Sequence, residues 1–210
     1  MALPIAASER QLKHRRHIDV QVFARDDGLW EVDAHLCDVR ERASELHGVA
    51  LPAGATIHDL LLRLVVDPHF NVLAAGAQSR TVPYPGACDA FAQAYEGLVG
   101  LNLMQGFRAA VRERLGGVLG CTHLSELTHV LPTAVVQAFG GAQGRSAELR
   151  ATATATASAS VGGLPATAQP FQIDRCRALR ADGATVKTYY PRWYRTSSAC
   201  LPSPTARDPS

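Results

Sequence analysis

The chain has 210 residues, 47% of them hydrophobic, and its 21 Lys and Arg residues nearly balance 19 Asp and Glu residues. This length and composition suffice for one sizeable hydrophobic core, whereas the near-neutral charge argues against a protein that binds nucleic acid or an anionic membrane. No stretch approaches the roughly 18 consecutive apolar residues of a membrane-spanning helix, so no membrane partner is expected.

The cysteines and the N-terminal residues indicate the compartment. Five cysteines at irregular spacing are not typical of a disulfide framework, and reduced thiols fit better. Residues 1–7 are apolar, but Ser8, Glu9 and Arg10 interrupt them at once, which argues against a secretory signal. We therefore predict a cytoplasmic protein.

The N-terminal part alternates between apolar and polar residues. Residues 18–25 and 29–38 both alternate, and Asp27-Gly28 between them is a turn signal, so this region predicts an antiparallel β-hairpin. In its second strand the even-numbered residues 30–36 would face the core and the odd-numbered residues 31–37 the polar side.

Two further strands are expected before the chain becomes helical. Residues 56–67 are apolar on nearly both sides, with Leu60, Leu62, Leu64 and Val66 at one parity, which predicts a central strand. Pro68 ends this strand, and residues 71–78 can return as a fourth one.

The apolar spacing changes to that of helices after residue 88. Residues 91–101 and 107–115 predict two helices, the second ended by Gly116-Gly117. A third helix begins near Thr122, which we expect to be its N-cap, and runs to Gly140-Gly141 with a kink at Pro132.

The C-terminal third contains an Ala/Thr/Ser stretch at 151–160, which predicts a mobile insertion at about 145–168. Residues 171–180 and 184–190 flank Asp182-Gly183 and predict a C-terminal β-hairpin.

These elements define an α+β fold: an antiparallel β-sheet, then a helical half, with the C-terminal hairpin packing back. We expect a basic, solvated N-terminal arm at residues 1–17, a single domain at 18–195 that contains the insertion, and a disordered tail at 196–210.

The segment around Cys121 is the most informative for chemistry. Gly120-Cys121-Thr122-His123 lies at the expected start of the third helix, where the helix dipole and unpaired N–H groups favour a thiolate. A thiolate either binds a metal or attacks an electrophile. The alternative is a buried small hydrophobic residue beside a capping turn.

A metal centre is the first hypothesis for function. Cys88 follows a Pro-x-Pro turn, Cys176 lies in the expected hairpin, and with Cys121 and His123 they complete a tetrahedral set suited to zinc or an iron–sulfur cluster. Such a module could act as a scaffold or carrier for a protein partner. Arg177, beside Cys176, could also steady a thiolate without metal.

A reactive-cysteine enzyme that acts on an acyl or thioester-like substrate is the second hypothesis. Cys121 would be the nucleophile, His123 or His35 the base, and Glu126 or Asp33 the group that orients it.

Acidic and imidazole side chains on the strands allow a third interpretation. Glu31, Asp33 and His35 share one strand, and His58, Asp59, Arg63 and Asp67 the next. If the strands are neighbours, a carboxylate could orient an imidazole, but an exposed polar face with ion pairs is favoured.

Five ordered segments between about Arg16 and Trp193 resemble the bacterial family called domain of unknown function 2889. They are residues 26–36, residues 57–64, Pro83-Tyr84-Pro85 with Cys88, residues 120–127 and residues 189–193. The resemblance implies kinship and supplies no mechanism. The family's C-terminal motif reads Cys-His-Ala-Leu, whereas Cys176-Arg177-Ala178-Leu179 has arginine in the histidine position, so a role of that histidine would be lost here.

The order of strands followed by helices that carry Cys88 and then Cys121 and His123 is also loosely similar to iron–sulfur scaffold proteins of the NifU/SufE type. This similarity rests on element order and ligand type, and a fold analogy does not establish function.

Overall fold

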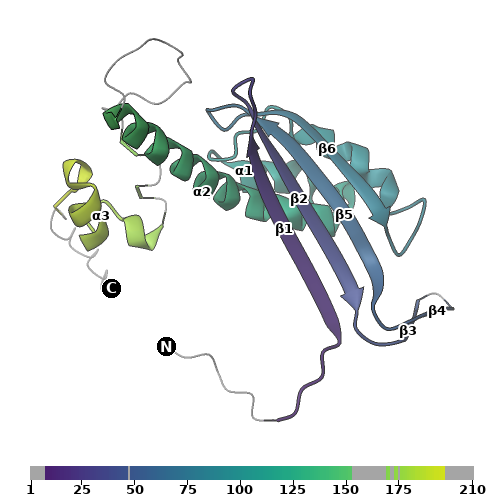
Figure 1. Cartoon of the computed structure of the whole chain (residues 1–210). Coiled ribbons are helices and arrows are strands. Elements are labelled where there is room, and N and C mark those ends of the chain that lie inside the picture. Colours follow the sequence, from purple (N-terminus) through teal and green to yellow (C-terminus); the bar gives the residue numbers. More distant parts are fainter. Residues whose placement is uncertain (1–7, 47, 153–168, 171–172, 175, 197–210) are drawn as a thin grey trace, which may run out of the picture. The chain divides into compact units, whose positions relative to one another are not determined.

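A computed structural model describes residues 8–46, 48–152, 169–170, 173–174 and 176–196 (Figure 1). The chain divides into two compact units, Met1–Gly162 and Gly163–Ser210, and each is considered by itself. Most of the predicted insertion, at 153–168, and of the predicted tail, at 197–210, lies outside the described residues.

The first unit is built on a four-stranded antiparallel sheet with the order β1-β2-β5-β6. Its strands are β1 (His14–Ala24), β2 (Trp30–Arg40), β5 (Ala55–Val66) and β6 (Val72–Thr81). The predicted antiparallel sheet is therefore confirmed. Strand β1 begins at His14, so residues 14–17, which we expected in a solvated arm, are part of the sheet.

The sheet has one buried face. As predicted, the even-numbered residues of β2 point to it. Val32, Ala34 and Leu36 of β2 are almost fully buried. The register pairs Leu36 with Ile18 of β1 and with Leu60 of β5, so side chains of equal parity line up across the strands. A small separate sheet of β3 (Ser44–Leu46) and β4 (Val49–Leu51), which the sequence did not predict, precedes β5.

Helices cover this buried face (Figure 1). They are η1 (Asp89–Leu98, a 3-10 helix), α1 (Phe107–Leu115), the 3-10 turn η2 (Gly117–Leu119) and α2 (Thr122–Thr152). Helix α2 contacts β1, β2 and β5 and contributes an apolar stripe to the core, namely Leu124, Leu127, Leu131, Val135 and Phe139. None of the described helices has the length and apolar character needed to cross a membrane.

Helix α2 differs from the sequence prediction at both ends. The Cys121 carbonyl accepts a hydrogen bond from the Ser125 amide at 2.9 Å, so Cys121 and not Thr122 occupies the N-cap position. The helix continues past Gly140 to Thr152, which makes residues 145–152 of the predicted insertion helical. Pro132 lies inside the helix and is buried.

The second unit contains helices where we predicted a β-hairpin. Its elements are η3 (Arg177–Leu179), α3 (Ala184–Tyr189) and η4 (Pro191–Trp193). A tight Asp-Gly hairpin turn requires positive φ, but Gly183 has φ −89° and ψ 156°, and its carbonyl accepts the Lys187 amide in the first turn of α3. The described part of this unit has a small core of Ile173, Ala181 and Val186.

Candidate metal centre

A carboxylate is buried on the helix-covered face of the sheet. Asp38 continues the even-numbered core positions of β2 beyond Leu36, and only 1% of the residue is exposed. A buried carboxylate is costly unless charged or hydrogen-bonding partners surround it. The partners of Asp38 therefore define the site.

Strand β1 supplies two of these partners. Arg16 lies directly opposite Asp38 in the register and donates two hydrogen bonds to it from one edge of its guanidinium, with Nε 2.7 Å from Oδ1 and Nη2 2.8 Å from Oδ2. His14 Nε2 lies 3.2 Å from Oδ1. Burial raises the pKa of Asp38, but Arg16, His58 and His14 outweigh it and hold this pKa below its ordinary value. Asp38 is thus ionised at neutral pH.

Two further imidazoles approach Asp38 from β5 and α2. His58 Nδ1 lies 2.9 Å from Asp38 Oδ2, and His123 Nε2 lies 3.9 Å from the same oxygen. The two rings are 3.8 Å apart between centroids. Burial, together with the nearby charges of His58 and Arg16, lowers the pKa of His123 below its ordinary value. His123 is therefore neutral at pH 7 and has a nitrogen lone pair available.

Asp38, His58 and His123 each offer a ligand atom, and these atoms lie within 4.8 Å of one another. Within the described part of the chain, this is the group of three His, Cys, Asp or Glu side chains that meets that criterion. Two imidazoles and one carboxylate form a ligand set used for zinc and, with open positions, for non-haem iron.

Cys121 contacts the other nitrogen of the same histidine. Its Sγ lies 3.9 Å from His123 Nδ1, whereas Asp38 is on the Nε2 side. The Tyr95 hydroxyl holds the Cys121 backbone, 2.7 Å from its carbonyl oxygen and 3.2 Å from its amide nitrogen. The thiol is thus placed to orient the imidazole of His123 while Nε2 stays free to bind.

The other two predicted metal ligands, Cys88 and Cys176, are not members of this three-residue group. Cys88 is at the N-cap of η1 and belongs to no such three-residue group among the described residues. Cys176 is an exposed residue of the second unit. Glu126, the predicted orienting residue, forms an ion pair with Arg16. Of the predicted set, the structure brings together Cys121 and His123.

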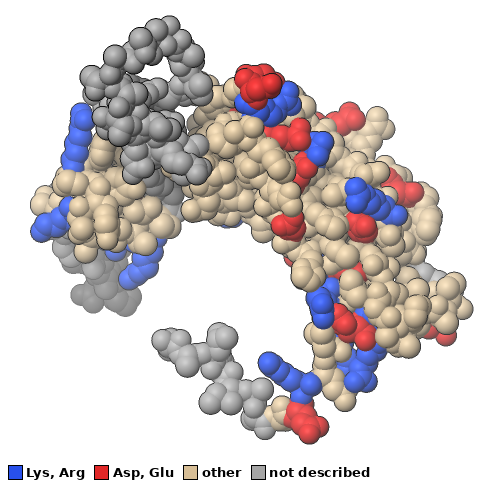
Figure 2. Space-filling model, viewed as in Figure 1, with Lys and Arg blue, Asp and Glu red and all other residues tan. Residues whose placement is uncertain are grey.

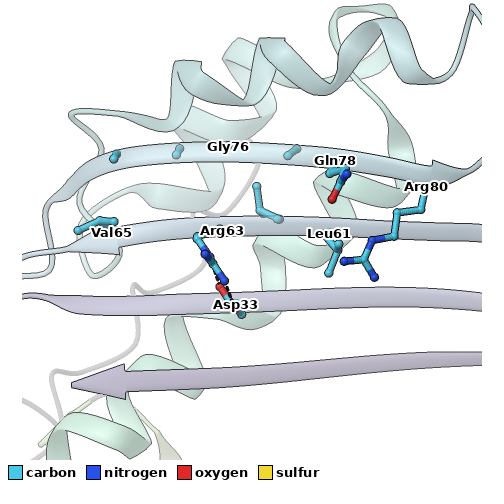
Figure 3. A pocket seen from close by; sticks show the side chains of 11 residues that line it. Asp33, Leu61, Arg63, Val65, Gly76, Gln78 and Arg80 are labelled. Atoms are coloured by element: carbon cyan, nitrogen blue, oxygen red, sulfur yellow. Dashed lines mark hydrogen bonds and ion pairs between the residues drawn. The ribbon is translucent and has the colours of Figure 1, made fainter. Parts of the chain in front are cut away.

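His35 and Asp33 point to the opposite face of the sheet. His35 Nε2 lies 2.8 Å from Asp59 Oδ1, and Asp33 accepts two hydrogen bonds of 2.6 Å from Arg63 (Figure 3). The carboxylate–imidazole pair that the sequence suggested between neighbouring strands is present, as His35 and Asp59. It lies on the outer face of the sheet, which also carries ion pairs of Arg63. The sheet separates His35 and Asp33 from Cys121, so the structure does not bring these predicted catalytic residues together.

The outer face carries charges of both signs. Figure 2 shows acidic and basic side chains interspersed over the visible side of the first unit, without a large area of one sign. A groove over the outer face of β5 and β6 lies beside the Asp33–Arg63 pair, and its lining includes Leu61, Val65 and Gly76 as well as the polar Gln78 and Arg80 (Figure 3).

Sequence reasoning missed Asp38, His14 and Arg16. The alternation of β2 could have indicated Asp38, because this charged residue continues the even-numbered positions that face the core. His58 was grouped with Asp59, although it has the parity of Leu60 and therefore faces the helices.

The fold and the site define the first unit as a two-layer α+β domain with a partly buried histidine–carboxylate cluster between its sheet and its longest described helix. Residues 14–137 match the family model of a protein of unknown function, DUF2889, and the chain belongs to that family. The match includes all the residues of the cluster. No curated protein and no solved structure matches the chain.

Proposed function

We propose that this domain is a metal-binding module whose centre is formed by Asp38, His58 and His123. The convergence of three ligand atoms from β2, β5 and α2 around the buried Asp38 carboxylate supports the proposal. The proposed function is the one predicted from the sequence, a metal site with scaffold or carrier potential. The proposed ligands differ from the predicted ones.

The chemistry of the ligands favours a transition metal. Neutral imidazole is the form that binds metal, and the lowered pKa of His123 keeps that form present at pH 7. Asp38 supplies the negative charge. A metal on Nε2 would leave Nδ1 of His123 beside the Cys121 thiol, as in sites where a hydrogen-bonding partner fixes the ring of a ligand. Zinc and ferrous iron are the ions that this set fits.

The four-residue set of Cys88, Cys121, His123 and Cys176 stays a separate hypothesis for the same function. It would suit zinc or an iron–sulfur cluster. The two sets share His123, so variants of the other residues distinguish them.

The test is metal binding by the full-length chain, purified anaerobically without a histidine tag. Zn²⁺ and Fe²⁺ are titrated by calorimetry, and bound metal is measured by elemental analysis. The variants are His58→Ala, Cys88→Ser and Cys176→Ser, with His129→Ala as the control, because His129 is an exposed histidine of the same helix as His123.

We expect one ion per chain, with binding lost in His58→Ala and retained in the two cysteine variants and in His129→Ala. Loss in the cysteine variants with retention in His58→Ala would instead support the four-residue set. A wild-type chain that neither retains nor binds either ion would overturn the metal-binding function.

The thiol–imidazole contact favours a second candidate function, a reactive-cysteine enzyme. In it, Cys121 at the N-cap of α2 would give its thiol proton to His123 and attack the carbonyl carbon of an acyl or thioester-like substrate. An acyl-cysteine would form as the bond to the substrate's leaving group breaks, and His123 would return the proton to that group. Iodoacetamide measures this directly, because an activated thiol alkylates with an apparent pKa below the value of about 8.5 for free cysteine. We expect His123→Gln to slow alkylation of Cys121. An unchanged rate and an apparent pKa near 8.5 would reject this candidate.

A further inference from the structure

Arg16 is shared between two carboxylates that differ in burial. Its Nε and Nη2 donate to Asp38 at 2.7 Å and 2.8 Å, and its Nη1 forms an ion pair with Glu126 of α2. The Asp38 side chain is 2% exposed, whereas the Glu126 side chain is 43% exposed. One guanidinium therefore joins a proposed metal ligand to a second, more exposed acidic group.

The two oxygens of Asp38 have their acceptor positions filled. A carboxylate oxygen has two lone pairs. Oδ1 accepts a hydrogen bond from Arg16 Nε and lies 3.2 Å from His14 Nε2. Oδ2 lies 2.8 Å from Arg16 Nη2 and 2.9 Å from His58 Nδ1. A metal ion that binds Oδ2 must therefore take a position that a hydrogen-bond donor holds.

The two donors at Oδ2 respond differently to a metal ion. His58 can change from donor to ligand, because a neutral imidazole has a lone pair on one of its nitrogens. Arg16 is cationic at every accessible pH and has no lone pair, so it can only compete with a metal cation for the carboxylate. Glu126 gives the guanidinium an anionic partner that it keeps when it releases Asp38.

We propose that Arg16 occupies Asp38 in the metal-free site and releases Oδ2 when a metal ion binds, with Glu126 retaining the guanidinium. This inference rests on the proposed metal-binding function and concerns what controls the affinity of that site. In the exchange Asp38 passes from one cation to another, and Arg16 keeps one of its two anionic partners. Arg16 thus lowers the affinity for metal, and Glu126 raises it.

Calorimetric titration of Zn²⁺ into the untagged full-length chain measures this competition. Arg16→Lys keeps the positive charge but replaces the planar fork by a point charge, so it separates the contact with Asp38 from general electrostatic repulsion. Arg63→Lys is the matched control, because Arg63 makes the same Nε and Nη2 contacts with Asp33 on the outer face. Circular dichroism and thermal unfolding check that each variant is folded.

We expect Zn²⁺ to bind Arg16→Lys at least about tenfold more tightly than wild type, since hydrogen bonds between charged groups are strong, and to bind Arg63→Lys as it binds wild type. Glu126→Gln should bind Zn²⁺ more weakly, because Arg16 then loses its other anion. In the double variant Arg16→Lys/Glu126→Gln this weakening should be smaller, since residues in one ion-pair network couple, whereas independent charges would add.

The result that overturns this role of Arg16 differs from the result that overturns the metal site. Equal or weaker Zn²⁺ binding by Arg16→Lys, or the same effect of Glu126→Gln in both backgrounds, would overturn the competition. The metal site would still stand if binding is lost in His58→Ala. Absence of Zn²⁺ binding in wild type and in Arg16→Lys would overturn the proposed function and this inference together.

Discussion

The buried hydroxyl of Tyr95 binds both backbone groups of Cys121, with its oxygen 2.7 Å from the carbonyl oxygen and 3.2 Å from the amide nitrogen. Its oxygen also lies 2.8 Å from Ser125 Oγ. One side chain of η1 therefore fixes the first residues of α2. Because His123 lies two residues after Cys121, this contact also sets where the imidazole meets Asp38.

Replacing Tyr95 by Phe tests this contact. The change keeps the ring in the core but leaves the Cys121 amide without its partner, so we expect a loss of about 1–3 kcal/mol in the free energy of unfolding. Urea denaturation measures the loss, and amide exchange should be faster at the start of α2. Tyr189→Phe is the control, because Tyr189 is 73% exposed. Equal stability of the two variants would contradict the structural role of the hydroxyl.

Substitution by alanine should have opposite effects on stability at two glycines of the helical layer, Gly120 and Gly140. A Cβ at Gly120 would lie 2.6 Å from the Leu115 carbonyl oxygen and 3.2 Å from the Tyr95 hydroxyl, so Gly120→Ala should destabilise the fold. A Cβ at Gly140 would meet nothing within 4 Å. Because Gly140 is inside α2, Gly140→Ala should stabilise it by about 0.5–1 kcal/mol. Thermal unfolding of both variants checks the pair, and a stabilising Gly120→Ala would refute the close approach.

Burial distinguishes two bidentate carboxylate–guanidinium pairs. The Asp38 side chain is 2% exposed beside Arg16, whereas Asp33 and Arg63 are 30% and 59% exposed. Asp38→Asn removes the buried charge that binds Arg16, His14 and His58 and leaves Glu126 as the acidic partner of Arg16, so we expect a loss of about 3–5 kcal/mol in the free energy of unfolding. Asp33→Asn should cost under about 1 kcal/mol, because solvent screens an exposed pair. Similar losses in chemical denaturation of the two variants would disprove the distinction.

We expect Asp67, in the turn between β5 and β6, to make the free energy of unfolding depend on pH in the acidic range. Burial raises its pKa, but hydrogen bonds from the Asn71 side chain and from the amides of Asn71 and His69 outweigh burial and lower the pKa of Asp67. A pKa that is lower in the folded state contributes stability above the unfolded pKa, about 4, and this stability is lost as the pH falls through the folded pKa.

The corresponding measurement is unfolding free energy between neutral pH and acid for wild type and Asp67→Asn. We expect the variant to be less stable than wild type at neutral pH. The difference in unfolding free energy should narrow as the pH falls from about 4 through the lowered folded-state pKa of Asp67. A difference that stays constant over this range would show that the charge of Asp67 contributes nothing.

The sequence by itself determined the sheet and the start of the helical layer. Alternation in β2 and β5 marked Val32, Leu36 and Leu60 as core residues, and all three are buried. These features are local, because side-chain parity and Asp-Gly turn chemistry act within a few residues. The C-terminal Asp182-Gly183 shows the limit of local signals. The same dipeptide can precede a helix, and no strand partner was specified there.

Only the tertiary structure decided the site. The local sequence around Asp38 does not indicate that Arg16, His58 and His123 contact this carboxylate. Those contacts depend on the register of β1 and β5 against β2 and on how α2 packs over the sheet. Register and packing are set by the whole buried face at once, since a slip of one residue would turn every side chain of a strand to the other side.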